Sequence, residues 1–219
     1  MLPIYTRVTL SAAAMLAAAL TPAAATVVYD GGAPDQGGII YSDTVINFAD
    51  FMSFTPSSSE TVNGVNWWGG CYQNVTCGSS TFAITIWSDN SGAPGTALET
   101  VMVGGANQTA TGKTIGGTFD EYSYSASITS FALSSSTEYW LEIQQLTTEP
   151  SGAWGWETTS SAPAGVQLIE NEDGPNVDLS EDLAFQLTDT TSVPEPASLC
   201  LLGAGAAGFF AMRRRKARD

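Results

Sequence analysis

The sequence predicts an all-β domain, an antiparallel β-sandwich of jelly-roll or immunoglobulin-like kind. Apolar and polar residues alternate in short runs along the middle of the chain, as in strands with one buried and one exposed face. Clusters of Gly, Pro, Asn, Asp and Ser separate these runs, and no run has a sustained helical period. Strands of this kind fit two sheets packed face to face.

The expected strands follow one another at short intervals. In chain order they cover residues 45–54, 61–68, 82–87, 97–103, 122–126, 139–143, 166–169 and 183–187. The clearest turn, residues 88–95, directly follows one of them. Alternation does not encode which strands pair, so the type of sandwich stays open. A parallel β-helix is the structural rival, but the chain has no internal repeat.

The first 25 residues predict a secretory signal peptide. Arg7 supplies a weakly positive start, residues 8–20 form an apolar segment, and the three alanines ending at Ala25 fit a cleavage site. Cleavage there would begin the mature chain at Thr26. An uncleaved N-terminal anchor is the alternative, although thirteen alanine-rich residues are few for crossing a bilayer.

Residues 26–191 form the predicted sandwich domain, which is long enough for one core and short for two domains. This segment holds twenty of the 22 carboxylates and only one of the seven cations, Lys113, so its net charge is −19. Such a charge favours solubility and opposes binding to nucleic acid or anionic lipid. Divalent cations, basic surfaces and neutral sugars stay open as partners.

The C-terminal segment, residues 192–219, has the order of a membrane sorting tail. A Pro-Glu-Pro break is followed by the apolar or small residues 197–212 and then by cations. Proline ends the domain, the apolar run enters the bilayer as a helix, and the cations stay cytoplasmic. At about 1.5 Å per residue the run spans about 24 Å, less than the ~30 Å of bilayer hydrocarbon, so the anchor is marginal. The basic cluster consists of Arg213, Arg214, Arg215, Lys216 and Arg218.

This tail resembles the PEP-CTERM sorting signal of exopolysaccharide-producing Gram-negative bacteria. The resemblance implies that the tail holds the chain in the inner membrane until an exosortase, a membrane transpeptidase-like enzyme, processes it. The recognition residues for that enzyme would be Val193, Pro194, Glu195 and Pro196. A plain membrane anchor with an accidental Pro-Glu-Pro linker is the alternative.

The middle of the chain also looks like a domain often found in PEP-CTERM proteins. The likeness rests on five segments, Val65–Gly69, Phe82–Gly95, Tyr139–Ile143, Trp154–Trp156 and Asp182–Leu187. They are framework features of strands and turns. The resemblance therefore implies a secreted, non-enzymatic sandwich and transfers no catalytic residue.

Cys71 and Cys77 are the only cysteines of residues 26–191, and we predict a disulfide between them. Five residues separate them, so their Cα atoms can approach across a turn in an oxidising compartment. The bond would contribute about 2–3 kcal/mol, mainly by restricting the unfolded chain. Two free thiols or half of a metal site are the alternatives, and a zinc site lacks further ligands nearby.

The composition indicates neither an enzyme nor a cofactor. The chain has no histidine, which excludes Ser-His-Asp and Cys-His arrangements and His-ligated metals. A glycosidase would need two carboxylates about 5–10 Å apart. Glu157, beside two tryptophans, and Glu142, on an apolar strand, are the acids to examine, but solvated surface acids are the ordinary explanation.

A weak calcium candidate lies within residues 171–178. Asp173, Asn176 and Asp178 supply oxygen ligands there, which calcium prefers. The segment lacks the residue order of an EF-hand loop, and turn-rich acidic loops usually bind nothing. We therefore predict no metal site.

Tryptophans invite a sugar-binding hypothesis, because an exposed flat ring can stack on a pyranose. The candidates are Trp67, Trp68, Trp154 and Trp156. Neighbouring strand residues point to opposite faces, so one of Trp67 and Trp68 is expected to be exposed. Trp154 and Trp156 share a face, and burial of both in the core is the simpler explanation. Trp87 and Trp140 would point outward or form a second layer of contacts.

Together these observations predict an exported, non-catalytic protein of the cell surface or extracellular matrix, processed by an exosortase and associated with exopolysaccharide. A carbohydrate-binding module that uses exposed tryptophans is the alternative, and a secreted glycoside hydrolase is a third reading.

Overall fold

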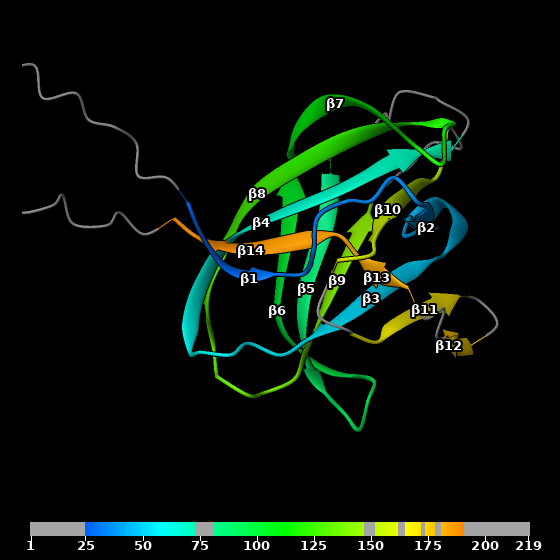
Figure 1. Ribbon diagram of the computed structural model, residues 1–219. Coiled ribbons are helices and arrows are strands. Elements are labelled where there is room, and N and C mark those ends of the chain that lie inside the picture. Colours follow the sequence, from blue (N-terminus) through cyan, green and yellow to red (C-terminus); the bar gives the residue numbers. More distant parts are fainter. Residues whose placement is uncertain are drawn as a thin grey trace, which may run out of the picture.

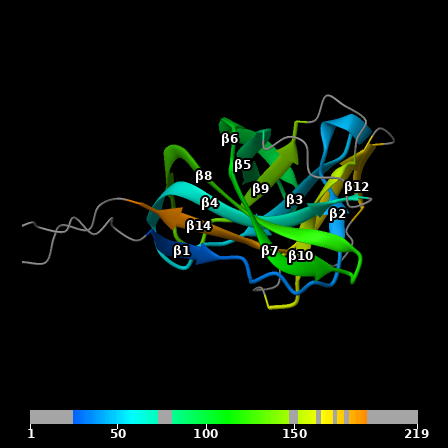
Figure 2. The same cartoon turned by 90° about the horizontal axis from the view of Figure 1, so that it is seen from above.

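Two antiparallel β-sheets make up the computed structural model of this protein (Figure 1). The structure describes residues 25–72, 81–146, 152–161, 165–171, 174–177 and 181–190. Seen from above, the two sheets form two layers (Figure 2). This arrangement confirms the all-β prediction and is the packing expected of a β-sandwich.

The first sheet has eight strands, with the long strand β4 at its centre. They are β1 (Thr26–Asp30), β2 (Ile39–Tyr41), β4 (Glu60–Cys71), β7 (Asn107–Ile115), β8 (Phe119–Leu133), β10 (Trp154–Thr159), β13 (Asp182–Leu183) and β14 (Phe185–Asp189). On one side of β4 lie β8 and then β7. On the other side β14 and β10 each pair with part of β4, β1 lies outside β14, and β2 and β13 lie outside β10.

The second sheet has six strands in the order β12-β11-β3-β9-β5-β6. They are β3 (Ala49–Phe54), β5 (Thr81–Asp89), β6 (Pro94–Gly104), β9 (Tyr139–Gln145), β11 (Gln167–Asn171) and β12 (Gly174–Val177). The predicted turn over residues 88–95 connects β5 to β6, where Ser91 and Gly92 have positive φ angles of 60° and 84°. This backbone region favours glycine.

One predicted strand is wrong in its first half. Within residues 45–54, strand β3 begins only at Ala49, and a short 3-10 helix, η1 (Thr44–Ile46), precedes it. The carboxylate of Asp43 accepts a hydrogen bond of 2.9 Å from the backbone N–H of Val45, which starts this turn. Asn47 ends it with a φ of 53°. Five further strands, β1, β2, β7, β10 and β12, were not among the expected strands.

The main core lies between the sheets and is rich in aromatic side chains. Trp67 of β4 stacks on Tyr124 of β8, with ring centroids 5.5 Å apart. The ring of Phe82 of β5 meets Trp67 and Trp154 edge-on, at 5.1 Å each. Both sheets therefore contribute to one apolar layer, whose removal from water is the main force that holds them together.

A second, smaller cluster covers the outer face of the second sheet. Phe51, Trp140 and Leu168 are buried there, and Trp87 packs against them. This confirms the second layer of contacts that was one of the two options for Trp87 and Trp140. The indole N–H of Trp140 donates to Asp89 at 3.0 Å.

The first and last described strands lie side by side. β1 pairs with β14 so that Thr26 faces Asp189, and both ends of the domain therefore lie at the same end of the sheet (Figure 1). Residues 1–24 of the predicted signal peptide and the tail from residue 192 lie outside the described residues. A mature chain that begins at Thr26 would thus start directly with a paired strand.

Candidate functional site

Three of the four candidate sugar-binding tryptophans are buried in the core. Trp67, Trp154 and Trp156 each have 0% of their surface exposed. Their rings pack between the sheets, and the indole N–H of Trp156 donates to the Ala184 carbonyl at 2.8 Å. The sugar-stacking hypothesis is therefore wrong for these three, and the simpler explanation of core packing is confirmed for Trp154 and Trp156.

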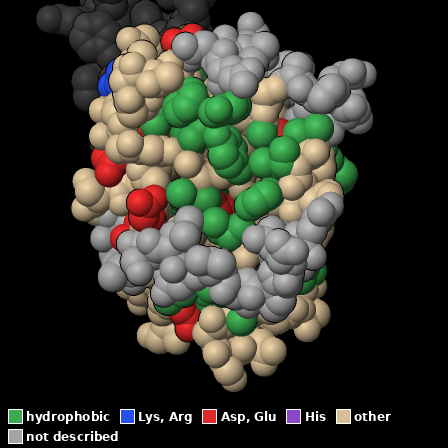
Figure 3. All heavy atoms as spheres, turned by 90° about the vertical axis from the view of Figure 1, so that its right-hand side faces the viewer, with side chains coloured by type: hydrophobic (Ala, Val, Ile, Leu, Met, Phe, Trp, Pro, Cys, Tyr) green, Lys and Arg blue, Asp and Glu red, His purple; other side chains and the backbone are tan. Residues whose placement is uncertain are grey.

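Trp68 points to the opposite face of β4 from Trp67 and is half-buried. Other apolar side chains are more exposed. Figure 3 shows hydrophobic side chains gathered on the face that lies at the right of Figure 1. Tyr72, which is 44% exposed, lies 6.0 Å from both Tyr41 and Phe119, measured between ring centroids. Its exposure sets it apart from the tryptophans of the core.

The acid predicted at Glu157 is part of a buried pair of carboxyl groups. Glu157 of β10 is 0% exposed, and Glu121 of β8 is 1% exposed. If both carboxyl groups are ionised, each can only accept hydrogen bonds. Glu157 Oε2 and Glu121 Oε1 then have no donor among the described atoms. Two carboxylates in contact cannot both be ionised without strong repulsion. A proton on Glu157 that is donated to Glu121 removes this conflict.

Gln36 closes the site from the loop between β1 and β2. Its backbone N–H donates to Glu157 Oε1 at 3.0 Å, and its side-chain Nε2 donates to Glu121 Oε2 at 3.0 Å. Its carbonyl accepts from the Gly116 N–H at 2.8 Å. The φ angle of Gln36 is 60°, in the left-handed region that non-glycine residues rarely adopt. The contacts with both acids hold this unfavourable conformation in place.

The environment of Glu157 keeps it protonated at neutral pH. Burial and then the neighbouring Glu121 carboxylate raise the pKa of Glu157 to about 8, while the hydrogen bond from Gln36 acts in the opposite direction. Lys113 offers little compensation, because its Nζ is 4.0 Å from Glu121 Oε1 and its side chain is 55% exposed. Both carboxyl groups touch each other and lie beneath Gln36, whereas a glycosidase pair flanks its substrate.

The second candidate acid, Glu142, has a structural partner. It lies on β9 and is 9% exposed, and its Oε2 accepts a hydrogen bond of 2.9 Å from the indole N–H of Trp87. Asp89 has the matching arrangement with Trp140, and this hydrogen bond lowers the pKa of Asp89. Both acids therefore orient the tryptophans of the outer cluster.

Another buried acid, Asp50 of β3, is hydrogen-bonded to the side chain of Gln167 of β11. It is 0% exposed, and Gln167 Nε2 donates to its Oδ1 at 2.9 Å. Burial raises the pKa of Asp50 well above its usual range, although this hydrogen bond opposes the shift. Asp50 Oδ2 and Gln167 Oε1 have no hydrogen-bond partner among the described atoms.

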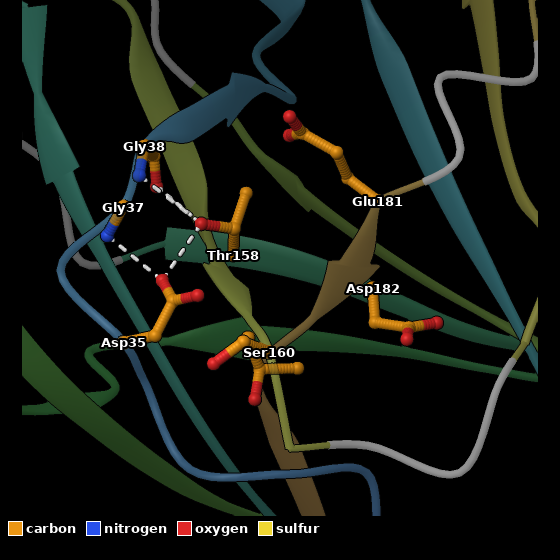
Figure 4. Close-up of a pocket in the computed structure, with 8 residues that line it drawn as sticks. Asp35, Gly37, Gly38, Thr158, Ser160, Glu181 and Asp182 are labelled. Carbon is orange, nitrogen blue, oxygen red and sulfur yellow. Dashed lines mark hydrogen bonds between the residues drawn. The ribbon is translucent and has the colours of Figure 1, made fainter.

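An open polar pocket of about 480 Å³ lies beside β10 (Figure 4). Its lining residues are Asp35, Gly37, Gly38, Thr158, Thr159, Ser160, Glu181 and Asp182. Asp35 Oδ1 accepts from the Gly37 N–H at 2.8 Å and from the Thr158 hydroxyl at 3.0 Å, so it is used to shape the loop. Within the described ranges, no group of three His, Cys, Asp or Glu side chains is placed to hold a metal ion.

Several predicted residues cannot be placed. Asp173, Asp178 and Cys77 lie outside the described residues, and only the backbone of Asn176 is described, in β12. Cys71 is 3% exposed at the end of β4. The disulfide and the calcium candidate therefore stay predictions.

Sequence reasoning missed the residues Glu121, Gln36 and Asp50. Their burial depends on partners far along the chain, since 85 residues separate Gln36 from Glu121 and 117 separate Asp50 from Gln167. The only local signal was that Glu121 and Asp50 each lie in or beside an alternating run.

The C-terminal segment leaves the domain at the end of β14. Strand β14 ends at Asp189, and Thr190 is the last described residue before the tail. In the described part of the chain, no helix is sufficiently long and apolar to cross a membrane. The predicted membrane helix, residues 197–212, and the basic cluster lie beyond it.

Comparison with known proteins identifies the tail. Residues 192–216 match a family model described as the PEP-CTERM protein-sorting motif, which confirms the resemblance drawn from the Pro-Glu-Pro, apolar and basic parts. No curated protein and no solved structure matches the chain. The motif indicates an exported protein that is targeted for exosortase processing at the cell envelope. This chain therefore carries a PEP-CTERM protein-sorting motif at residues 192–216.

Proposed function

We propose that this chain is a non-catalytic protein of the cell surface or extracellular matrix of a Gram-negative bacterium. Residues 197–212 hold it in the inner membrane as an intermediate, and an exosortase then processes it near Pro194-Glu195-Pro196. The sorting motif at residues 192–216 is the observation that carries the proposal. The sandwich acts by being displayed, in association with exopolysaccharide.

The buried acids support a non-catalytic role. Catalytic carboxyl groups need access to substrate, but the raised-pKa acid Glu157 is covered by Gln36 and is hydrogen-bonded to Glu121. Glu142 is occupied by an indole N–H. Both candidate acids are thus explained by the packing of the domain.

The charge of the domain supports association with neutral rather than anionic material. Residues 26–191 carry a net charge of −19, which repels polyanions such as nucleic acids and acidic polysaccharides. A neutral exopolysaccharide meets no such repulsion. A sugar-binding module that stacks sugars on exposed tryptophans lacks support, because Trp67, Trp154 and Trp156 are buried.

The test is the mass of the mature protein from cells with and without the processing enzyme. We expect loss of the N-terminal 25 residues in both strains, and loss of the segment after the Pro-Glu-Pro motif only where the enzyme is present. A variant with Pro194, Glu195 and Pro196 replaced by alanine should keep its tail. Retention of residues 197–212 in the surface fraction of both strains would refute the proposal.

A further inference from the structure

The side chain of Asn63 joins the end of β14 to the central strand of the first sheet. Its Oδ1 accepts from the backbone N–H of Thr190 at 2.7 Å and from the Thr190 hydroxyl at 2.8 Å. Its Nδ2 donates to Asp189 Oδ1 at 3.0 Å. The side-chain oxygen of Asn63 thus accepts two hydrogen bonds, and its nitrogen donates one to a carboxylate.

This connection lies beyond the regular strand pairing. The ladder between β4 and β14 ends with Gly64 opposite Thr188, and the pairing of β4 with β8 on its other side shifts in register between Val62 and Gly64. Asn63 lies at this shift, and its side chain reaches past the β4–β14 ladder to Asp189, the last residue of β14, and to Thr190.

Hydrogen bonds rather than burial hold this end of the chain. Thr190 is exposed, and an open groove of about 310 Å³ lies beside Asp189, lined also by Ser59, Glu60, Thr61, Ala132 and Leu133. Asp189 also pairs with Thr26 of β1, so loss of the Asn63 contacts would free Thr190 without opening the core. Strand ends that have few buried contacts open at low cost in free energy.

The sequence places the processing motif very close to this connection. Only Thr191, Ser192 and Val193 lie between Thr190 and Pro194. A fully extended chain covers at most about 3.6 Å per residue, so Pro194 lies within about 14 Å of Thr190. The apolar run begins at residue 197, so an enzyme that works at the membrane surface must reach the motif next to the folded domain.

We propose that Asn63 is a positioning residue that restrains the processing segment and slows exosortase processing. By holding Thr190, it leaves only Thr191, Ser192 and Val193 between the bonded end of the domain and Pro194. Release of these contacts adds Thr190 to this segment, while Asp189 stays paired with Thr26 of β1. This proposal rests on the proposed function, because the processed motif is the one assigned there.

The experiment compares processing rates of full-length variants in cells that contain the exosortase. The variants are Asn63→Ala, a spacer variant with four Gly-Ser residues inserted after Thr191, and the combination of both. Asn66→Ala is the matched control, since Asn66 lies on the same strand, is half-buried, and makes no side-chain hydrogen bond within the described residues. The readouts are the processed fraction over time after pulse labelling and hydrogen exchange of the Thr190 amide.

We expect Asn63→Ala and the spacer variant each to be processed several-fold faster than the wild type and Asn66→Ala. The double variant should be no faster than the spacer variant alone, because both changes relieve the same restraint. Thr190 should exchange faster in Asn63→Ala, with an unchanged Tm. An unchanged or slower processing rate for Asn63→Ala, or effects that multiply in the double variant, would overturn the proposal.

A failure of the proposed function gives a different result. In that case the wild type and every variant keep their tails. The connection is then judged from hydrogen exchange alone, and a Thr190 amide that exchanges in the wild type as fast as an unfolded amide refutes it.

Discussion

Replacement of Glu157 by glutamine should make the domain much less sensitive to alkaline pH. The unfolded carboxyl titrates near its ordinary pKa of 4.5, whereas the pKa of Glu157 in the folded domain is about 8. Below pH 4.5 the group is protonated in both states. As the pH rises from 4.5 to 8, the unfolded state loses its proton and the folded state keeps it, so the free energy of unfolding falls. Above pH 8 both states are ionised and the loss is complete.

The size of this loss follows from the displacement of the pKa. One pKa unit corresponds to about 1.4 kcal/mol, so the change from 4.5 to about 8 destabilises the folded state by about 3–5 kcal/mol at pH 9. In Glu157→Gln the carboxamide oxygen still accepts from Gln36, and its NH₂ group donates to Glu121. The variant should therefore match the wild type at pH 5 and exceed its free energy of unfolding by about 3–5 kcal/mol at pH 9.

Urea unfolding at pH 5, 7 and 9, followed by tryptophan fluorescence, measures this difference. Glu99→Gln on the edge strand β6 is the control, because it removes the same charge from a partly exposed position. It accounts for the general relief of repulsion in an acidic domain. If the free energies of unfolding of Glu157→Gln and the wild type change in parallel between pH 5 and pH 9, the buried carboxyl pair does not hold a proton as argued.

Two further predictions concern packing. Trp67→Ala should lower the free energy of unfolding by about 3–5 kcal/mol, and Trp68→Ala by less than half as much, because only Trp67 is fully buried. Urea denaturation curves with equal m values would measure both losses. Equal losses would contradict the assignment of Trp67 and Trp68 to opposite faces of β4. Gly69→Ala should destabilise by about 1–3 kcal/mol, because its Cβ would collide with the backbone oxygen of Gly155 in the neighbouring strand. Gly38→Ala is the control, because a Cβ there meets nothing within 4 Å, and its thermal midpoint should stay within a few degrees of the wild type. A similar shift of the thermal midpoint in Gly69→Ala and Gly38→Ala would count against the close approach of β4 and β10.

Local patterns predicted most of the strands. The runs 61–68, 82–87, 97–103, 122–126 and 139–143 all fall within strands β4, β5, β6, β8 and β9. The 3-10 helix at Thr44 was missed because it depends on the side chain of Asp43, and the polar edge strand β7 was missed because neither face of it shows an apolar pattern. An alternating pattern reports burial on one face, and edge strands and capped turns lack that signal.

The candidate site was predicted less well than the fold. Glu157 was selected because of its tryptophan neighbours, and the structure does give it an unusual environment, but the partners that create that environment are Glu121 and Gln36. They lie in other strands and loops of the first sheet. The pairing that brings such residues together leaves no trace in the spacing of the sequence.

The sequence by itself determined that this protein is built from strands and carries a sorting motif at residues 192–216, because alternation and the order of proline, apolar and basic residues are properties of neighbouring positions. Only the tertiary structure decided that Trp67, Trp154 and Trp156 are core residues, and that Asn63 holds Thr190 next to the motif. Burial and hydrogen bonding of this kind arise where segments far apart in the chain meet, and that meeting depends on how the strands pair and how the two sheets pack.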